Sequence, residues 1–326
     1  MLAAGAALGV VVSACTPEVR LVPTAPPAST PTPAATPTRV PIAEPTLAPT
    51  AIPLAPTPVP TAAPTPASAP DVEVVTPVPP LDGVLDGLLP DDSVAYGLVL
   101  EDLGSGARTA VNEGEPYPSA SLYKLGVAWL ALREVDAGRL SLDAPLLIED
   151  EDTDEPEPRG GFKAGDTPTV HEALDAMLSV SSNAAAHAFL RVLGRASVNQ
   201  EMERIGLTQT RVPDDGEAEA ITSAGDIARL LRLISTSPEL SVAGKEVLAQ
   251  GMANIAPPDA LRETLPNTVG ILDKTGNLPD SSNVGALLET SRGTVILVVV
   301  DTGVNPGEAR AVIAEMGQIA FHTLLE

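Results

Sequence analysis

Residues 118–138 read PSASLYKLGVAWLALREVDAG, a turn that begins with proline and runs into one long helix. The apolar side chains of the helical part recur at the spacing of a single buried face: Leu122, Leu125, Trp129, Leu130 and Leu132. Gly138 marks the expected helix end. Ser121 and Lys124 stand three residues apart at the helix start, so their side chains lie on one face. Because a serine hydroxyl needs a neighbouring base to act as a nucleophile, the pair is a candidate for a catalytic serine and its base, although on its own it is more typical of a helix cap and a solvated lysine.

A second short motif, Ser181-Ser182-Asn183, lies at the junction of two predicted helices, 167–178 and 183–193. On its own, such a cluster is typical of a helix N-cap, because short polar side chains accept hydrogen bonds from the free N–H groups of the first turn. These side chains become candidates for the site only through the combination of this motif with the other two.

A third motif, Lys274-Thr275-Gly276, lies on a predicted strand near the C-terminus. Lys124 can accept a proton only when its amine is neutral, and burial together with a second ammonium group from Lys274 would lower its pKa. A developing oxyanion would be bound by backbone N–H groups at the start of the serine-bearing helix and by the N–H of Asn277.

Alternating polarity predicts two strands before the serine-bearing helix and three near the C-terminus: 93–103, 108–112, 271–275, 284–289 and 294–301. Further helices are expected over 81–89, 227–234 and 306–325, the last with Asn305 as its N-cap. The order of elements predicts an α+β fold. One antiparallel sheet would be built from both ends of the chain and covered by the first and last helices, with a helical lobe inserted between them. A cleft is expected where the two lobes meet.

Residues 149–157 (EDEDTDEPE) carry seven carboxylates but lack the glycine and ligand spacing of a calcium-binding loop. Self-repulsion favours a solvated loop instead. His187 lies one turn after Asn183, and we interpret it as a packed helical residue rather than a site residue.

The N-terminus has a composition of its own. Residues 1–14 are small and apolar, and Val12-Ser13-Ala14-Cys15 resembles a bacterial lipobox, which predicts a signal peptide over 1–15 and lipidation of Cys15. The alternative is an ordinary signal peptide with an incidental cysteine. Twenty of the 34 prolines fall within 17–80, so 16–80 is expected to be a disordered Pro/Thr/Ala-rich linker and 81–326 the folded domain.

Composition narrows the classes of function. The 19 basic and 43 acidic residues give a net charge of −24, which opposes binding to nucleic acid or anionic lipid, so we expect membrane association through the lipid alone. With one cysteine and three scattered histidines, neither a thiolate metal site nor a Ser-His-Asp triad is supported. We expect a monomer without metal or cofactor.

The three motifs occur in the order S-x-x-K, S-S-N and K-T-G, which resembles the signature of class A β-lactamases and penicillin-binding proteins. The flanking segments VSSNAAAHAFLRVLG (180–194), ITSAGDIARLL (221–231) and LDKTGN (272–277) are also similar to that family. The resemblance covers 81–326 and implies a five-stranded antiparallel sheet flanked by helices beside an all-helical lobe.

The resemblance also implies roles. Ser121 would be acylated, Lys124 would be its base, and Ser181 would pass a proton to the leaving nitrogen. The substrate would be bound through Asn183, which holds its amide, through Lys274 and Thr275, which hold its carboxylate, and along the strand at Gly276 and Asn277.

Three departures from the family pattern stand out. Ser182 replaces the aspartate that braces the S-D-N loop, and Asn283 stands where typical β-lactamases carry a carboxylate-binding arginine. The segment 207–221 is short and lacks the glutamate that orients the deacylating water in β-lactamases. The carboxylates nearest to that place are interpreted as parts of a polar surface loop: Asp214, Asp215, Glu217 and Glu219.

The sequence thus predicts an extracytoplasmic, lipid-anchored serine hydrolase that forms an acyl-enzyme with β-lactams or D-alanyl peptides and deacylates slowly. A penicillin-binding-type D-alanyl-D-alanine carboxypeptidase or endopeptidase acting on peptidoglycan peptide is the alternative within the same fold. A non-catalytic cell-wall-binding lipoprotein is the alternative from another class.

Overall fold

The structure is a computed structural model that describes residues 81, 83–89, 94–157, 161–214 and 219–326. All of them belong to the second of two units of the chain, Val72–Glu326. The predicted signal peptide, the lipidation site at Cys15 and the proline-rich linker lie outside the described residues. Within the described part of the chain, none of the helices has the length and hydrophobicity needed to cross a membrane.

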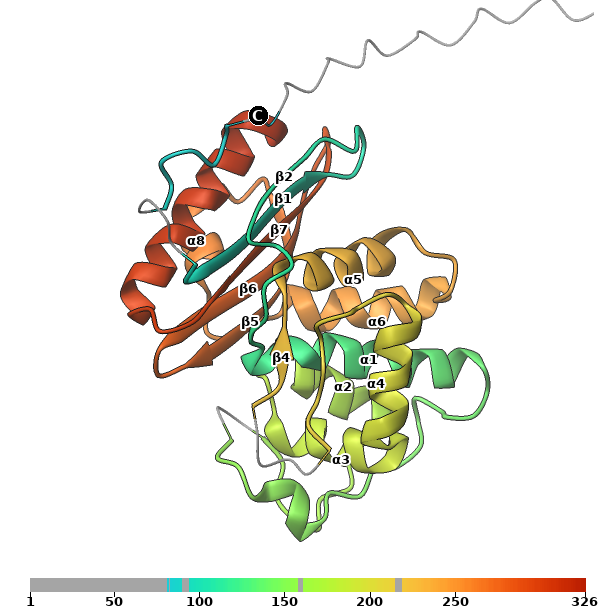
Figure 1. Ribbon diagram of the computed structural model, residues 1–326. Helices are drawn as coiled ribbons and strands as arrows, with labels where there is room; N and C mark the ends of the chain where they lie inside the picture. Colours follow the sequence, from blue (N-terminus) through green and yellow to red (C-terminus); the bar gives the residue numbers. More distant parts are fainter. Residues whose placement is uncertain (1–80, 82, 90–93, 158–160, 215–218) are drawn as a thin grey trace, which may run out of the picture. The chain divides into compact units, whose positions relative to one another are not determined.

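The two ends of the described chain build one antiparallel sheet, as predicted (Figure 1). Its strands are β1 (Tyr96–Asp102), β2 (Arg108–Val111), β5 (Gly270–Leu278), β6 (Ser281–Thr290) and β7 (Gly293–Asp301). They lie in the order β2-β1-β7-β6-β5. The pairing of β1 with β7, in which Tyr96 faces Asp301, joins the N-terminal hairpin to the C-terminal strands. The five strands predicted from the sequence correspond to these five strands, but the predicted ranges were shorter than the observed β5 and β6 and longer than the observed β1.

The two faces of the sheet belong to two apolar cores. Leu98 and Leu100 of β1 point to the face covered by α8 (Pro306–Ala320), whereas Val99 between them belongs to the core shared with the other helices. This follows from the two-residue period of a strand, because neighbouring side chains point to opposite faces. Asn305 caps α8 by accepting from the Gly307 N–H, as expected from its sequence, and the helix continues into a π-helical turn, Phe321–Leu325.

Six further helices of the described chain form the predicted inserted lobe (Figure 1). They are α1 (Tyr123–Asp136), α2 (Val170–Ser179), α3 (Asn183–Leu193), α4 (Arg195–Arg204), α5 (Ala224–Thr236) and α6 (Val242–Ala253). The short α7 (Ala260–Thr264) packs instead against α8. Predicted helices match α1, α2, α3 and α5, whereas α4, α6 and α7 were not predicted. Several helices begin at a capping hydroxyl, such as Thr169 before α2 and Ser223 before α5.

The prediction of a helix over 81–89 is wrong. Residues 83–89 form successive turns, because Gly83 and Gly87 adopt φ values of 72° and 80°, outside the right-handed helical region. The apolar spacing that suggested a helix still serves the core, since Leu81, Leu85 and Leu88 are buried on the side of the sheet covered by α8.

The acidic segment 149–157 is also more ordered than predicted. A short 3-10 helix, η2 (Asp150–Thr153), begins at Glu149 in a reciprocal capping box with Asp152. Asp152 is only 2% exposed and accepts a hydrogen bond of 2.7 Å from Arg191 of α3. Arginine on the neighbouring helix therefore offsets part of the self-repulsion that favoured a solvated loop.

Candidate active site

Ser121 lies in a tight 3-10 turn, η1 (Ala120–Leu122), which leads directly into α1. The turn is held by a hydrogen bond from the Ser119 N–H to the Ala220 carbonyl, at 2.6 Å, and Ala120 adopts a φ of 44°. A left-handed alanine is an unfavourable conformation of the kind that concentrates at functional sites.

Strand β5 runs directly against this turn because Gly276 carries no side chain. A Cβ at Gly276 would lie 3.0 Å from both the Ser119 carbonyl oxygen and the Ser121 nitrogen. The third motif therefore needs its glycine to bring β5, with Asn277 and Thr275, up to the predicted nucleophile.

Lys124 is completely buried, one turn along α1 from Ser121. Its Nζ donates to the Asn183 Oδ1 at 2.6 Å and to the Ser181 carbonyl at 2.7 Å, and it lies 3.4 Å from the Ser181 Oγ. The first two predicted motifs thus meet through the lysine amine.

Lys274 joins the third motif to the same serine. It is 1% exposed, and its Nζ donates to the Ser181 Oγ at 3.1 Å and to the Thr275 carbonyl at 3.0 Å. Ser181 adopts a φ of 62°, a left-handed conformation that aims its hydroxyl between the two lysines. The three side chains form a hydrogen-bonded Lys124–Ser181–Lys274 series along which a proton can move.

Burial changes the acidity of both amines in the way the sequence suggested for Lys124. Burial, assisted by the positive charge of Lys274, lowers the pKa of Lys124 to about 7, and the carboxylates of Glu157 and Glu155 oppose this. Burial also lowers the pKa of Lys274 to about 8, with Asp273 acting in the opposite direction. At neutral pH a large fraction of Lys124 is therefore a neutral amine that can accept a proton.

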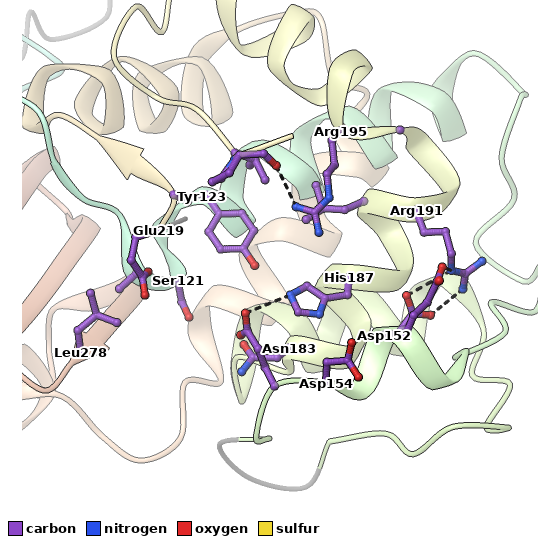
Figure 2. Close-up of a pocket in the computed structure, with 18 of the residues that line it drawn as sticks. Ser121, Tyr123, Asp152, Asp154, Asn183, His187, Arg191, Arg195, Glu219 and Leu278 are labelled. Atoms are coloured by element: carbon purple, nitrogen blue, oxygen red, sulfur yellow. Dashed lines mark hydrogen bonds and ion pairs between the residues drawn. The ribbon is translucent and has the colours of Figure 1, made fainter. Parts of the chain in front are cut away.

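A cleft of about 810 Å³ opens in front of Ser121. Figure 2 shows Ser121 pointing into it, with Glu219 and Leu278 beside the serine and His187 and Asp154 farther along. Asn183 and Asn277 line the same cleft. The interpretation of His187 as a packed helical residue is therefore incomplete, because His187 lines the cleft, with its Nε2 3.6 Å from the Glu155 carboxylate.

Asn283, which stands in place of an expected arginine, does not offer its side chain to the cleft. It is 1% exposed, donates to the Pro118 carbonyl at 2.8 Å and accepts from the Asp301 N–H at 2.9 Å. Its amide therefore anchors the chain just before the η1 turn to β6.

The structure describes two of the four carboxylates near the short 207–221 segment, Asp214 and Glu219, and places them differently. Glu219 was interpreted as part of a polar surface loop, but it also lines the cleft together with Ser121. Asp214 is exposed and forms an ion pair of 2.9 Å with Arg211. Asp215 and Glu217 lie outside the described residues.

Glu157 contacts the site but was not among the site residues predicted from the sequence. Its carboxylate contacts the Ser182-Asn183 turn, with an oxygen 3.1 Å from the Ser182 hydroxyl. The available signal was the absence of an aspartate at Ser182 together with a run of carboxylates nearby, but spacing alone did not indicate which of them reaches the turn.

The geometry defines a class first: Ser121, the buried Lys124 and Lys274 amines and Ser181 lie between a five-stranded antiparallel sheet and a helical lobe, the arrangement expected of a serine hydrolase. The model of the beta-lactamase enzyme family matches residues 82–324. The chain belongs to this family and is a β-lactamase-like serine hydrolase.

Solved structures with the same fold agree. An ancestral (GNCA) class A β-lactamase is 28% identical with a TM-score of 0.64, over 70% of this chain and 93% of its own. A β-lactamase from Xanthomonas campestris pv. campestris is 26% identical with a TM-score of 0.63, over 71% and 92%. The structure of PBP-A, 22% identical, matches in fold with a TM-score of 0.69, over 76% and 98%.

The lowered amine pKa values can be measured without a substrate. The chain has four lysines, Lys124, Lys163, Lys245 and Lys274, so ¹³C-lysine labelling gives a small set of NMR signals. We expect the Lys124 signal to titrate near pH 7 and the Lys274 signal near pH 8, with single Lys→Arg variants providing the assignments. Titration of both signals near their ordinary value, about pH 10.4, would contradict the burial argument.

Proposed function

We propose that Ser121 is acylated by β-lactams, with Lys124 as its base. The observation that carries the proposal is the contact of the buried Lys124 amine, whose pKa is lowered to about 7, with Ser181 and Asn183. A neutral amine one turn from a serine at a helix start is the arrangement that nucleophilic catalysis requires.

In the proposed step, Lys124 takes the Ser121 proton while Oγ bonds to the carbonyl carbon of the lactam. The C–N bond then breaks, and the leaving nitrogen receives a proton from Ser181. The Lys124 ammonium returns the proton to Ser181, so that charge and protons balance. Lys274 has the charge and place to bind a substrate carboxylate when it is protonated, which its pKa of about 8 permits at neutral pH.

The neighbouring structures support a β-lactam as the substrate. A point mutant of PBP-A was solved as an acyl-enzyme complex with penicillin G, on the same fold. A D-alanyl peptide presents a carbonyl and a carboxylate in similar positions, so a peptidase acting on cell-wall peptide is the alternative within this mechanism. Because the chain belongs to the beta-lactamase enzyme family, an enzymatic function is favoured over that of a non-catalytic cell-wall-binding lipoprotein.

Replacement of Ser121 tests the nucleophile. We expect Ser121→Ala to abolish covalent labelling by a fluorescent penicillin, because the acyl bond forms on its hydroxyl oxygen, while the thermal unfolding midpoint stays close to that of the wild type. The matched control is Ser119→Ala, which removes a buried hydroxyl that lacks a hydrogen-bond partner among the described residues. Mass spectrometry of the intact protein would measure the adduct, and a labelled Ser121→Ala variant would disprove the assignment.

We further propose that deacylation is slow. Glu219 is the one carboxylate of the described 207–214 and 219–221 residues that lines the cleft, and it is exposed, so it holds a water less firmly than a buried, hydrogen-bonded base would. Loss of a well-placed general base costs about 10²–10⁴ in rate. Acylation should therefore outrun hydrolysis.

The expected kinetic sign is a burst. With a chromogenic β-lactam in a stopped-flow experiment, product equal to the enzyme concentration should form before a slow steady state. Glu219→Gln should slow the steady state further and leave the burst intact, whereas Asp214→Asn, the control outside the cleft, should change neither. Rapid turnover without a burst would argue against slow deacylation.

For the N-terminal part of the chain we propose lipidation at Cys15 and an extracytoplasmic, membrane-anchored location, supported by the Val12-Ser13-Ala14-Cys15 run. Cys15→Ser should move the full-length protein from the membrane fraction to the soluble fraction of cells, because the lipid would supply the anchor. Unchanged fractionation would mean that another element holds the chain.

A further inference from the structure

The turn that begins α3 carries two site residues and has no carboxylate of its own. Ser181 and Asn183 flank Ser182, whose hydroxyl caps α3 by accepting from the Ala185 N–H at 3.2 Å. One hydroxyl satisfies only one of the free N–H groups in the first turn of a helix. The N–H groups of Asn183 and Ala184 therefore require another acceptor.

Glu157 supplies that acceptor from a loop far earlier in the chain. Its Oε1 accepts from the Ala184 N–H at 2.5 Å and from the Ser182 hydroxyl at 3.1 Å, and its Oε2 accepts from the Asn183 N–H at 3.2 Å. A carboxylate at this point is stabilised by the positive end of the helix dipole. Hydrogen bonds to a charged acceptor are also stronger than neutral ones.

The Asn183 side chain is held by two further hydrogen bonds. The Pro156 carbonyl accepts from the Asn183 Nδ2 at 2.9 Å, while the Oδ1 of the same amide accepts from Lys124 at 2.6 Å. The amide is thus fixed at both ends. Gly161 leaves the space that Glu157 occupies, because a Cβ at Gly161 would overlap the carboxylate.

The charge of Glu157 also reaches the base. It raises the pKa of Lys124, against the effects of burial and of Lys274. Removal of this charge should therefore shift the neutral form of Lys124 to lower pH, an effect that a purely steric brace would not produce.

We propose that Glu157 is a positioning residue that braces the Ser181–Asn183 turn from a distant loop and thereby holds Lys124 against its oxygen partners. The inference rests on the proposed acyl-transfer function of the site. Glu157 acts through Asn183 and Lys124, and it takes the place of the carboxylate that the Ser182 position lacks.

Four variants test this: Glu157→Gln, Ser182→Asp, their combination, and Asp150→Asn as a control that removes one charge from the same acidic segment. Glu157→Gln should lower the rate constant of acylation by about 10- to 100-fold, the scale expected when reacting groups are misplaced by about 1 Å. Ser182→Asp alone should also slow acylation, because two carboxylates then compete for one set of N–H groups. The combination should recover to within about two- to threefold of the wild type, and Asp150→Asn should not change the rate.

Two readouts do not depend on acylation. Glu157→Gln should speed hydrogen exchange of the Asn183 and Ala184 amides and lower the midpoint of the Lys124 ¹³C titration. If the wild type is not acylated, the proposed function fails, and these two readouts still decide the role of Glu157. Additive losses in the combined variant, or exchange and titration equal to those of Asp150→Asn, would overturn the inference.

Discussion

Two amines buried against one serine hydroxyl are the arrangement on which the rest of the site depends. Lys124 and Lys274 both lie within 3.4 Å of the Ser181 Oγ, and both are almost entirely shielded from water. Two full ammonium charges so close together in a dry site would repel each other strongly. The structure accommodates them because burial makes the neutral form of at least one amine accessible at physiological pH, and that form is the one able to accept a proton.

This arrangement costs stability near neutral pH. Both lysines bind protons less tightly in the folded protein, with pKa values of about 7 and 8, than in the unfolded chain, where the value is about 10.4. Between those values the unfolded chain binds more protons, so their contribution to the free energy of unfolding rises as pH increases from about 7 to about 10. The two apolar cores, one on each face of the sheet, offset this cost.

Much of this architecture could be predicted from sequence because its signals are local. The period of the strands, the Asn305-Pro306 helix start and the three motifs each depend on neighbouring residues. The prediction over 81–89 failed because Gly83 and Gly87 change backbone direction without changing the apolar spacing. Helices α4 and α6 were missed because their apolar stripes are short, and α4 buries only Val198 and Met202.

The parts of the site that sequence could not supply are long-range. Glu157 reaches the Ser182 turn from an acidic segment whose several carboxylates cannot be distinguished by sequence. Glu219 lines the cleft, although the sequence of its loop is typical of a polar surface loop. Pairing of β3 (Tyr117–Pro118) with β4 (Ile221–Thr222) brings that loop beside the nucleophile, and a two-residue strand leaves almost no pattern to detect. Such a pairing can be recognised only once the three-dimensional structure is known.

Two carboxylates of the acidic segment 149–157 make different contacts with α3. The buried Asp152 forms an ion pair with the partly exposed Arg191, which ties the segment to α3. Five residues later, Glu157 caps the same helix at its N-terminus. Capping by a carboxylate from another loop couples the position of that loop to the turn that holds Asn183. Since Asn183 also accepts from Lys124, a shift of this segment would be transmitted to the base through two hydrogen bonds. The acidic segment is thus part of the support of the site, although none of its residues carries a recognisable motif.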